Sequence, residues 1–387
     1  MNKAPLFILL IVAVVVVSGC AAQQQADLVK VSFEKASALE KGAGYAADYT
    51  TAVSFSFSDS FKDYSTKNPT LAMTFKALGS LKANFKLTEA VGNAGNNKKV
   101  VMDMSEFIAS ISKASPSGAS GLPANMIISS YKDGKDATVC MEADPSFWKS
   151  FGKAVNTSVC VKGDAKDLSK SGIIGNMFSQ FSQYSSTTPS NSLEALATLY
   201  SKGLLNVGAM KDDSAAGRPC KSVAFSISDI SKLSDADFTK LLSGSAPTGN
   251  SEGSFQKPVA SLIKTLIKEV SEEFCFDNEN GLPLKVKASV GMDMSVILKL
   301  GLQQAKALAQ SEEQKTQVDS SINDIPSNLV MTTHVDLEAT KFKTPSQSAD
   351  LTAPTGAKAY SAEDFTSMFA PKATDEIVPT TGTGAQV

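Results

Sequence analysis

The chain has 387 residues, of which 42% are hydrophobic, so it can build a sizeable core in one large or two medium domains. Its net charge is only −2 and no basic stripe runs along it, which argues against nucleic acid as a partner. Positive charge is almost all lysine, with Arg218 the only arginine, so little is available for bidentate recognition of phosphates.

The N-terminus is typical of an export signal, which we assign to residues 1–19. Lys3 precedes an apolar run, Leu6 to Val17, which is shorter than the about 20 residues that a membrane span needs. The run ends in Val17-Ser18-Gly19-Cys20, which resembles the lipobox of prokaryotic lipoproteins. The resemblance implies that Cys20 is lipidated after cleavage and that residues 20–26 form a lipidated tether. An ordinary cleaved signal and an uncleaved anchor are the alternatives.

The elements expected next are one helix and a series of strands. Apolar residues over 27–40 fit one face of an amphipathic helix. Period-2 alternation then predicts strands with one buried and one wet face. These strands are expected at residues 53–57, 71–75, 81–87 and 100–104. Asp133-Gly134 lies between two strand-like runs, 126–130 and 137–141, and predicts a hairpin, which a further strand at 157–161 follows.

The second half of the chain mixes helical and strand patterns. Helices are expected at residues 168–184, 192–202, 234–242 and 258–273, and strands at 220–227, 274–277, 284–292 and 329–342. The clearest helical pattern is Pro258 to Glu273, with proline in the first turn and one apolar face. Residues 297–321 are mostly helix-forming. Residues 351–387 are expected to be a tail that is partly disordered, because they are rich in Thr, Pro, Gly and Ala.

The cysteines favour two disulfides. Four remain besides Cys20, namely Cys140, Cys160, Cys220 and Cys275, and an even number in an exported chain favours pairing. Three connectivities exist, and we favour Cys140–Cys160 and Cys220–Cys275 because each pair is adjacent in cysteine order. The alternative is a four-cysteine zinc site, but such sites usually contain close C-x₂₋₄-C pairs, and this sequence has none.

Two short motifs give the chain a family resemblance over residues 27–350. Asp277-Asn278-Glu279-Asn280-Gly281-Leu282-Pro283 is similar to a D-x-x-[ST]-G-L-P hairpin, with Asn280 in place of Ser or Thr. Phe342-Lys343-Thr344-Pro345 is similar to a closing F-x-x-P strand. With the N-terminal helix, these stretches resemble the lipoprotein-carrier (LolA-like) superfamily, which includes LppX-type lipoproteins. The resemblance implies an α+β fold in which a curved antiparallel sheet, a half-barrel, wraps around several helices and leaves an apolar cavity for acyl chains. The segment 168–202 and the stretches around the cysteines would be insertions.

No catalytic constellation is evident, and we expect neither enzyme activity, nor a cofactor, nor a metal. Serine, cysteine and zinc hydrolases usually need a histidine, and the only one, His334, is predicted on the solvent side of a strand. Asp277 and Glu279 lack the spacing of a calcium loop, so a polar turn is the favoured interpretation. A hydrolase that uses carboxylates alone stays open as a weaker alternative.

The candidate ligand residues are aromatic residues and methionines on the predicted buried strand faces. They are Phe55, Phe57, Met73, Phe75, Phe85, Met102 and Met104. They form either an ordinary core or an adaptable apolar cavity. The sequence therefore predicts a lipid-anchored protein on the extracytoplasmic face of the cell membrane that binds or carries a lipid or other apolar molecule. The alternative is a surface structural or interaction lipoprotein without a small ligand.

Overall fold

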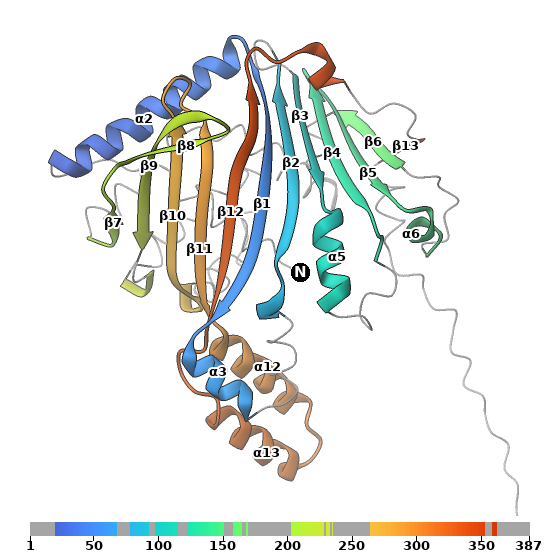
Figure 1. The fold of residues 1–387 in the computed structure, drawn as a ribbon. Coiled ribbons are helices and arrows are strands. Elements are labelled where there is room, and N and C mark those ends of the chain that lie inside the picture. The colour runs from blue at the N-terminus through green and yellow to red at the C-terminus, as the bar shows by residue number, and fades with distance from the viewer. Residues whose placement is uncertain are drawn as a thin grey trace, which may run out of the picture.

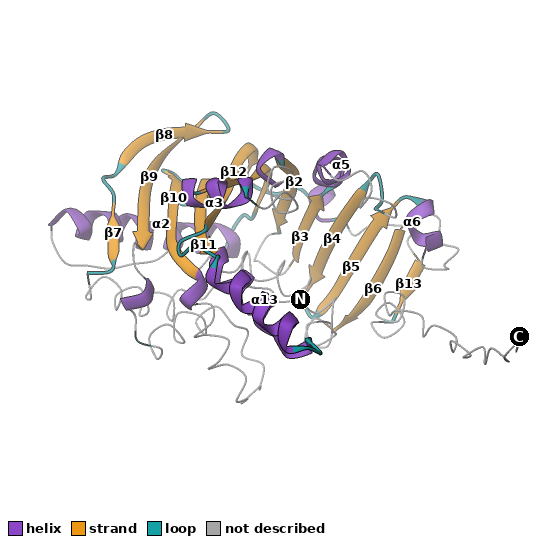
Figure 2. Ribbon diagram, turned by 90° about the horizontal axis from the view of Figure 1, so that it is seen from below, coloured by secondary structure: helices purple, strands orange, loops and turns teal. Residues whose placement is uncertain are grey.

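The protein is built on one large sheet that does not close into a barrel (Figure 1). The computed structural model describes residues 20–67, 78–92, 97–114, 122–150, 158–164, 168, 203–227, 230–232, 234, 264–352 and 358–361. Its 13 strands follow the order β13-β6-β5-β4-β3-β2-β1-β12-β11-β10-β9-β7, and β8 pairs with β9. Figure 2 shows β7 and β13 at opposite ends of this row of strands. Of the expected α+β fold, the large antiparallel sheet with a few helices is confirmed.

The first half of the sheet is a meander in which each strand pairs with the next. Its strands are β1 (Tyr45–Phe57), β2 (Ala83–Val91), β3 (Asn97–Asp103), β4 (Met126–Asp133), β5 (Asp136–Ala143) and β6 (Ser158–Asp164). The predicted turn at Asp133-Gly134 joins β4 to β5, and Gly134 has the positive φ, 58°, that favours glycine in tight hairpin turns.

The second half returns to the first strand. Its strands are β7 (Leu205–Val207), β8 (Lys211–Ala215), β9 (Arg218–Ile227), β10 (Ile267–Asp277), β11 (Pro283–Asp293) and β12 (Val330–Lys343). The last of these, β12, pairs with β1 from Ala46↔Lys343 to Phe57↔Met331 and joins the halves. Beyond it, β13 (Lys358–Tyr360) pairs in parallel with β6, so the expected tail contributes an edge strand. Residues 362–387 lie outside the described part.

The described helices lie near the ends of the sheet or pack against it, as the one at Ser105–Ala114 does against β2. They are α2 (Cys20–Lys41), α3 (Asp59–Thr66), α5 (Ser105–Ala114), α6 (Pro145–Ser150), α12 (Met294–Leu308) and α13 (Glu312–Asn323), with short 3₁₀ turns at Ile230–Lys232 and Ser348–Leu351. In Figure 1, α2 crosses the upper ends of β9 and β10, and α3, α12 and α13 form a group below the strands. Side chains cap this group: Ser58 caps α3, Asp293 caps α12, and Ser311 caps α13.

One face of the sheet, here called the inner face, carries the core. It is the face on which Tyr45, Ala47 and the other odd-numbered residues of β1 lie. The buried side chains of β1, β2 and β3 on this face pack against Ala36 and Leu39, so α2 covers that end of it. Around β5 and β6, a second cluster surrounds the fully buried Trp148. The opposite, outer face is wetter, as antiparallel sheets allow.

The predicted helix at Pro258–Glu273 is wrong in its second half. Only residues 264–266 are helical, and Ile267 begins β10; residues 258–263 lie outside the described part. Apolar residues at Ile267 and Val270 fit a helical period, but β9 and β11 pair with β10 on both sides and supply its backbone hydrogen bonds. Tertiary pairing thus overrides the local pattern. The strand predicted at 71–75 and the helices predicted at 192–202 and 234–242 lie outside the described residues, as does the helix at 168–184 apart from Leu168.

Candidate functional site

The predicted apolar residues that the structure describes share the inner face. Phe55 and Phe57 lie on the odd-numbered side of β1, and Phe85 pairs with Thr51 on that side. Met102 pairs with the inner residue Leu87, and Met104 packs with it against the same core. Met73 and Phe75 lie outside the described residues. The alternation of apolar residues therefore predicts correctly that these described residues lie on one side of the sheet, the inner face.

Part of this face is only half-buried. We call this part the apolar strip, and it consists of Val53, Phe55, Phe85, Val286, Val335 and Leu337. Nearer α2, by contrast, Tyr45, Ala47 and Tyr49 of the same face are buried. Phe57, another of the predicted ligand residues, is not part of the apolar strip. The centre of its ring lies 4.8 Å from that of Phe61, beside the helical group below the sheet. The middle of the inner face, over β2, β1, β12 and β11, thus keeps partly accessible apolar surface.

A buried glutamate lies beside this strip. Glu272 is 2% exposed and faces inward, paired with Ala288 on β11 and Phe225 on β9. Within the described part of the chain, neither oxygen of its carboxyl group has a hydrogen-bond partner. Burial raises the pKa of Glu272 well above its ordinary value and so favours the uncharged acid.

Glu272 is not among the residues predicted from the sequence, because the helical pattern of Pro258–Glu273 places it at the end of a helix. The signal that could have found it is the alternation of Val270, Glu272, Phe274 and Phe276, which all turn out to be buried. Under a strand interpretation, this pattern places a carboxyl among inward apolar residues, where an ionisable group is unusual.

Two other charged groups on the inner face, Lys98 and Glu89, are paired with each other, while the buried hydroxyl of Thr51 has no hydrogen-bond partner among the described residues. The ammonium nitrogen of Lys98 lies 2.6 Å from a carboxylate oxygen of Glu89, an ion pair made by proximity and not by aligned hydrogen bonds. Tyr45, beside them, has its pKa raised by burial and then by the charge of Glu89. Burial also raises the pKa of Glu40 at the end of α2, against the nearby charge of Lys98. The charges of this cluster therefore compensate one another at the end of the inner face that α2 covers.

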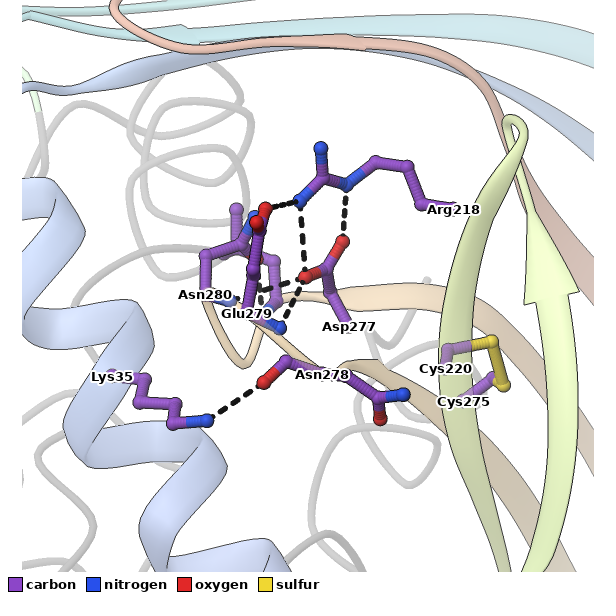
Figure 3. A network of polar contacts seen from close by, with 9 residues as sticks. Lys35, Arg218, Cys220, Cys275, Asp277, Asn278, Glu279 and Asn280 are labelled. Atoms are coloured by element: carbon purple, nitrogen blue, oxygen red, sulfur yellow. Dashed lines mark hydrogen bonds and ion pairs between the residues drawn. A yellow bond between two sulfur atoms is a disulfide. The ribbon is translucent and has the colours of Figure 1, made fainter.

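The only arginine stabilises the β10–β11 turn (Figure 3). The guanidinium of Arg218 donates hydrogen bonds to Asp277 and Glu279 and lies 5.0 Å from the centre of the Phe342 ring. Asp277 also accepts from the backbone N–H groups of Glu279, at 2.8 Å, and Asn280, at 3.1 Å. Burial alone would raise the pKa of Asp277, but Arg218 and these N–H groups outweigh it and lower the pKa. The predicted polar turn is therefore observed.

The same turn holds α2. Lys35 donates to the backbone oxygen of Asn278 at 2.7 Å (Figure 3). Gly281 has φ +72°, and a Cβ added there would lie 2.1 Å from the backbone oxygen of Ser32. Cys20 is the first residue of α2, about 22 Å along the helix from Lys35 at about 1.5 Å per residue. The helix that starts at the proposed lipid site is thus fixed to the sheet at its other end.

Both predicted disulfides are confirmed. Cys140–Cys160 joins β5 to β6, and Cys220–Cys275 joins β9 to β10 beside the arginine network. Asp213 lies near Cys220 and Cys275, but disulfide sulfurs are not the thiolates that metals bind. The alternative of a four-cysteine zinc site is therefore wrong.

The only histidine connects three strands on the outer face. His334 shares its side of the sheet with Ser56 and Ser289, and its ring nitrogens lie 2.8 and 2.9 Å from their hydroxyl oxygens. Both nitrogens are engaged by hydroxyl groups, which leaves none for the carboxylate that orients a catalytic histidine in a triad. The predicted parity is correct, although the ring is half-buried.

Comparison with known proteins adds no relative. No protein-family model matches the chain, and no curated protein matches it significantly. Among the described helices, none combines the length and apolar character needed to cross a membrane.

Proposed function

We propose that this protein is a lipoprotein of the extracytoplasmic membrane face that binds or carries a lipid or other apolar molecule on its inner face. A LolA-like half-barrel is the proposed architecture, with the inner face turned toward the ligand. The observation that carries the proposal is the apolar strip, which stays half-buried in the middle of a face that is buried on either side.

The chemistry of the strip favours an apolar ligand. Leaving apolar surface in water costs about 25 cal/mol per Å², so a ligand that covers the strip gains that free energy. Phe55 and Phe85 offer flat rings, and Met102 and Met104, next to the strip, have flexible side chains that adapt to ligands of varied shape. The role proposed is binding, without a chemical step.

The position of the proposed anchor is consistent with the same assignment. Cys20 begins α2, and α2 packs on the inner face through Ala36 and Leu39. A lipid on Cys20 would hold this face within about one helix length of the membrane. Labelling with a radioactive fatty acid tests the anchor: label should enter the wild-type protein and be lost from Cys20→Ser, and its retention would contradict lipidation at this residue.

Native mass spectrometry after gentle extraction tests the ligand. We expect a lipid of defined mass to co-purify with the full chain. Phe55→Asp, in the apolar strip, should reduce the lipid-bound fraction at least about fivefold, since it puts a charge against the ligand. Thr50→Asp changes an exposed position of the same strand on the outer face and should leave the lipid-bound fraction unchanged. Repeated ligand-free spectra of the wild type would contradict the proposal and favour the structural or interaction role.

A further inference from the structure

Glu272 lies in the same cross-strand row as the apolar strip. Reading across the inner face, Val53 pairs with Val335, Val335 with Ala288, and Ala288 with Glu272. Glu272 and Val335 are therefore two strand spacings apart, about 10 Å. Only Ala288, which is 3% exposed, separates them in this row.

The carboxyl group of Glu272 has no structural partner within the described residues. Its exposure is 2% and both oxygens lack hydrogen bonds, whereas buried Asp277 is bound by Arg218 and Glu89 is paired with Lys98. Buried polar groups in folded proteins are nearly always hydrogen-bonded, so an exception points to a bond made with something else. A strand position on the inner face directs this unused group toward the side on which the ligand is proposed to bind.

We propose that Glu272 is the polar contact of the bound ligand, and that the ligand is an acyl lipid whose carbonyl oxygen accepts a hydrogen bond from the Glu272 O–H. This inference rests on the proposed function and adds one polar contact to a ligand whose acyl chains the family resemblance already implies. The acyl chain would lie along the apolar strip, and its ester or amide carbonyl would point toward the Glu272 side of the strip.

The surroundings of Glu272 select a neutral acceptor. Its nearest described inner-face neighbours are Ala288, Phe225, Val270 and Phe274, none of which carries a charge. No cation in this set could balance a phosphate or a free carboxylate, while an uncharged carboxylic acid has one O–H to donate. The raised pKa of Glu272 agrees with that protonation state.

Photocrosslinking of the full chain in membranes tests the inference. Two diazirine probes of equal chain length are compared, palmitic acid methyl ester and the corresponding alkane, and labelled peptides are mapped by mass spectrometry. In the wild type, both probes should label β10–β12. Glu272→Leu removes the hydrogen bond, so ester labelling should fall about fivefold to tenfold while alkane labelling stays within about twofold. Glu272→Gln keeps a donor and should restore ester labelling. Glu269→Leu, at an exposed position of β10, is the matched control and should change neither.

The outcomes separate the two proposals. If both probes label the wild type and Glu272→Leu lowers both equally or neither, the assigned role of Glu272 is overturned while ligand binding stands. If neither probe labels the inner face of the wild type, the proposed function fails. If Glu272→Gln loses ester labelling as Glu272→Leu does, a hydrogen-bond donor at this position does not restore binding, and the inference is rejected.

Discussion

Arg218 should contribute strongly to stability, because its guanidinium compensates a carboxylate that the fold buries. The Asp277 side chain is 1% exposed and that of Arg218 is 26% exposed. Arg218→Ala should lower the free energy of unfolding by about 2–4 kcal/mol, because it leaves a buried charge without its main partner. Lysine cannot reproduce the two-pronged contact, so Arg218→Lys should recover less than half.

Urea denaturation under non-reducing conditions measures the effect of the Arg218 variants. Lys221, on the same strand, makes an exposed ion pair with Asp212, and Lys221→Ala should cost less than about 0.5 kcal/mol. Equal losses for Arg218→Ala and Lys221→Ala would show that the network around Asp277 is not a stabilising one.

Glu272 should give the protein a stability that declines as pH rises. In the unfolded chain it loses its proton at about pH 4.3, whereas burial keeps it protonated in the fold. Between these two pKa values the folded state binds more protons. The free energy of unfolding therefore falls by up to about 1.4 kcal/mol per pH unit, and it levels off above the raised pKa.

Glu272→Gln removes this dependence, so the variant should gain on the wild type as pH rises from 5 to 8. The comparison is made by guanidinium titrations across that range. Glu269→Gln serves as the exposed control on the same strand, and its difference from the wild type should stay constant with pH. A parallel pH dependence in wild type and Glu272→Gln would mean that Glu272 ionises normally in the fold.

At the scale of elements, the contact between α2 and the β10–β11 turn depends on one glycine. Gly281→Ala combines an unfavourable φ with a collision against the Ser32 backbone, so α2 must move. Gly134 has a similar φ, +58°, but nothing within 4 Å of an added Cβ. Gly134→Ala should therefore cost only the backbone term, about 1–2 kcal/mol.

We expect Gly281→Ala to cost at least about 1 kcal/mol more than Gly134→Ala and to speed amide exchange in α2. Hydrogen–deuterium exchange of residues 28–41 in both variants measures this difference. If α2 exchanges equally in the two variants, the turn does not hold the helix.

The elements that the sequence predicted well are those whose signals are local. The Asp133-Gly134 hairpin requires only a turn with positive φ, and the alternation at residues 53–57 specifies which side of β1 faces inward. The segment from Pro258 failed because its apolar spacing fits both a helix and a strand, and only pairing with β9 and β11 decides between them. Glu272 was missed for the same reason, since its inward direction exists only in the strand.

The face that carries the candidate site could be predicted from the sequence, but the degree of burial of its residues could not. Alternation placed Phe55, Phe85 and Met102 on one face, but the half-burial that separates the apolar strip from an ordinary core depends on where α2 lies. The Arg218 network was not predicted either, because Arg218 lies 59 residues from Asp277 in the chain. Long-range contacts of this kind leave no periodic signal in a sequence.

At the scale of the whole molecule, each half of the sheet contains one disulfide, while the described pairing of β1 with β12 joins the halves by hydrogen bonds and packing. A disulfide that closes a longer loop removes more entropy from the unfolded chain and should stabilise the fold more. Cys220–Cys275 spans 55 residues and should contribute about 4 kcal/mol, whereas Cys140–Cys160 spans 20 and should contribute about 3 kcal/mol.

The Cys220→Ala/Cys275→Ala variant should therefore unfold at a lower urea concentration than the Cys140→Ala/Cys160→Ala variant. All four cysteines are buried, so alanine is the matched replacement in both pairs. The reverse order would show that packing around the sulfurs, and not loop closure, determines what each bridge contributes.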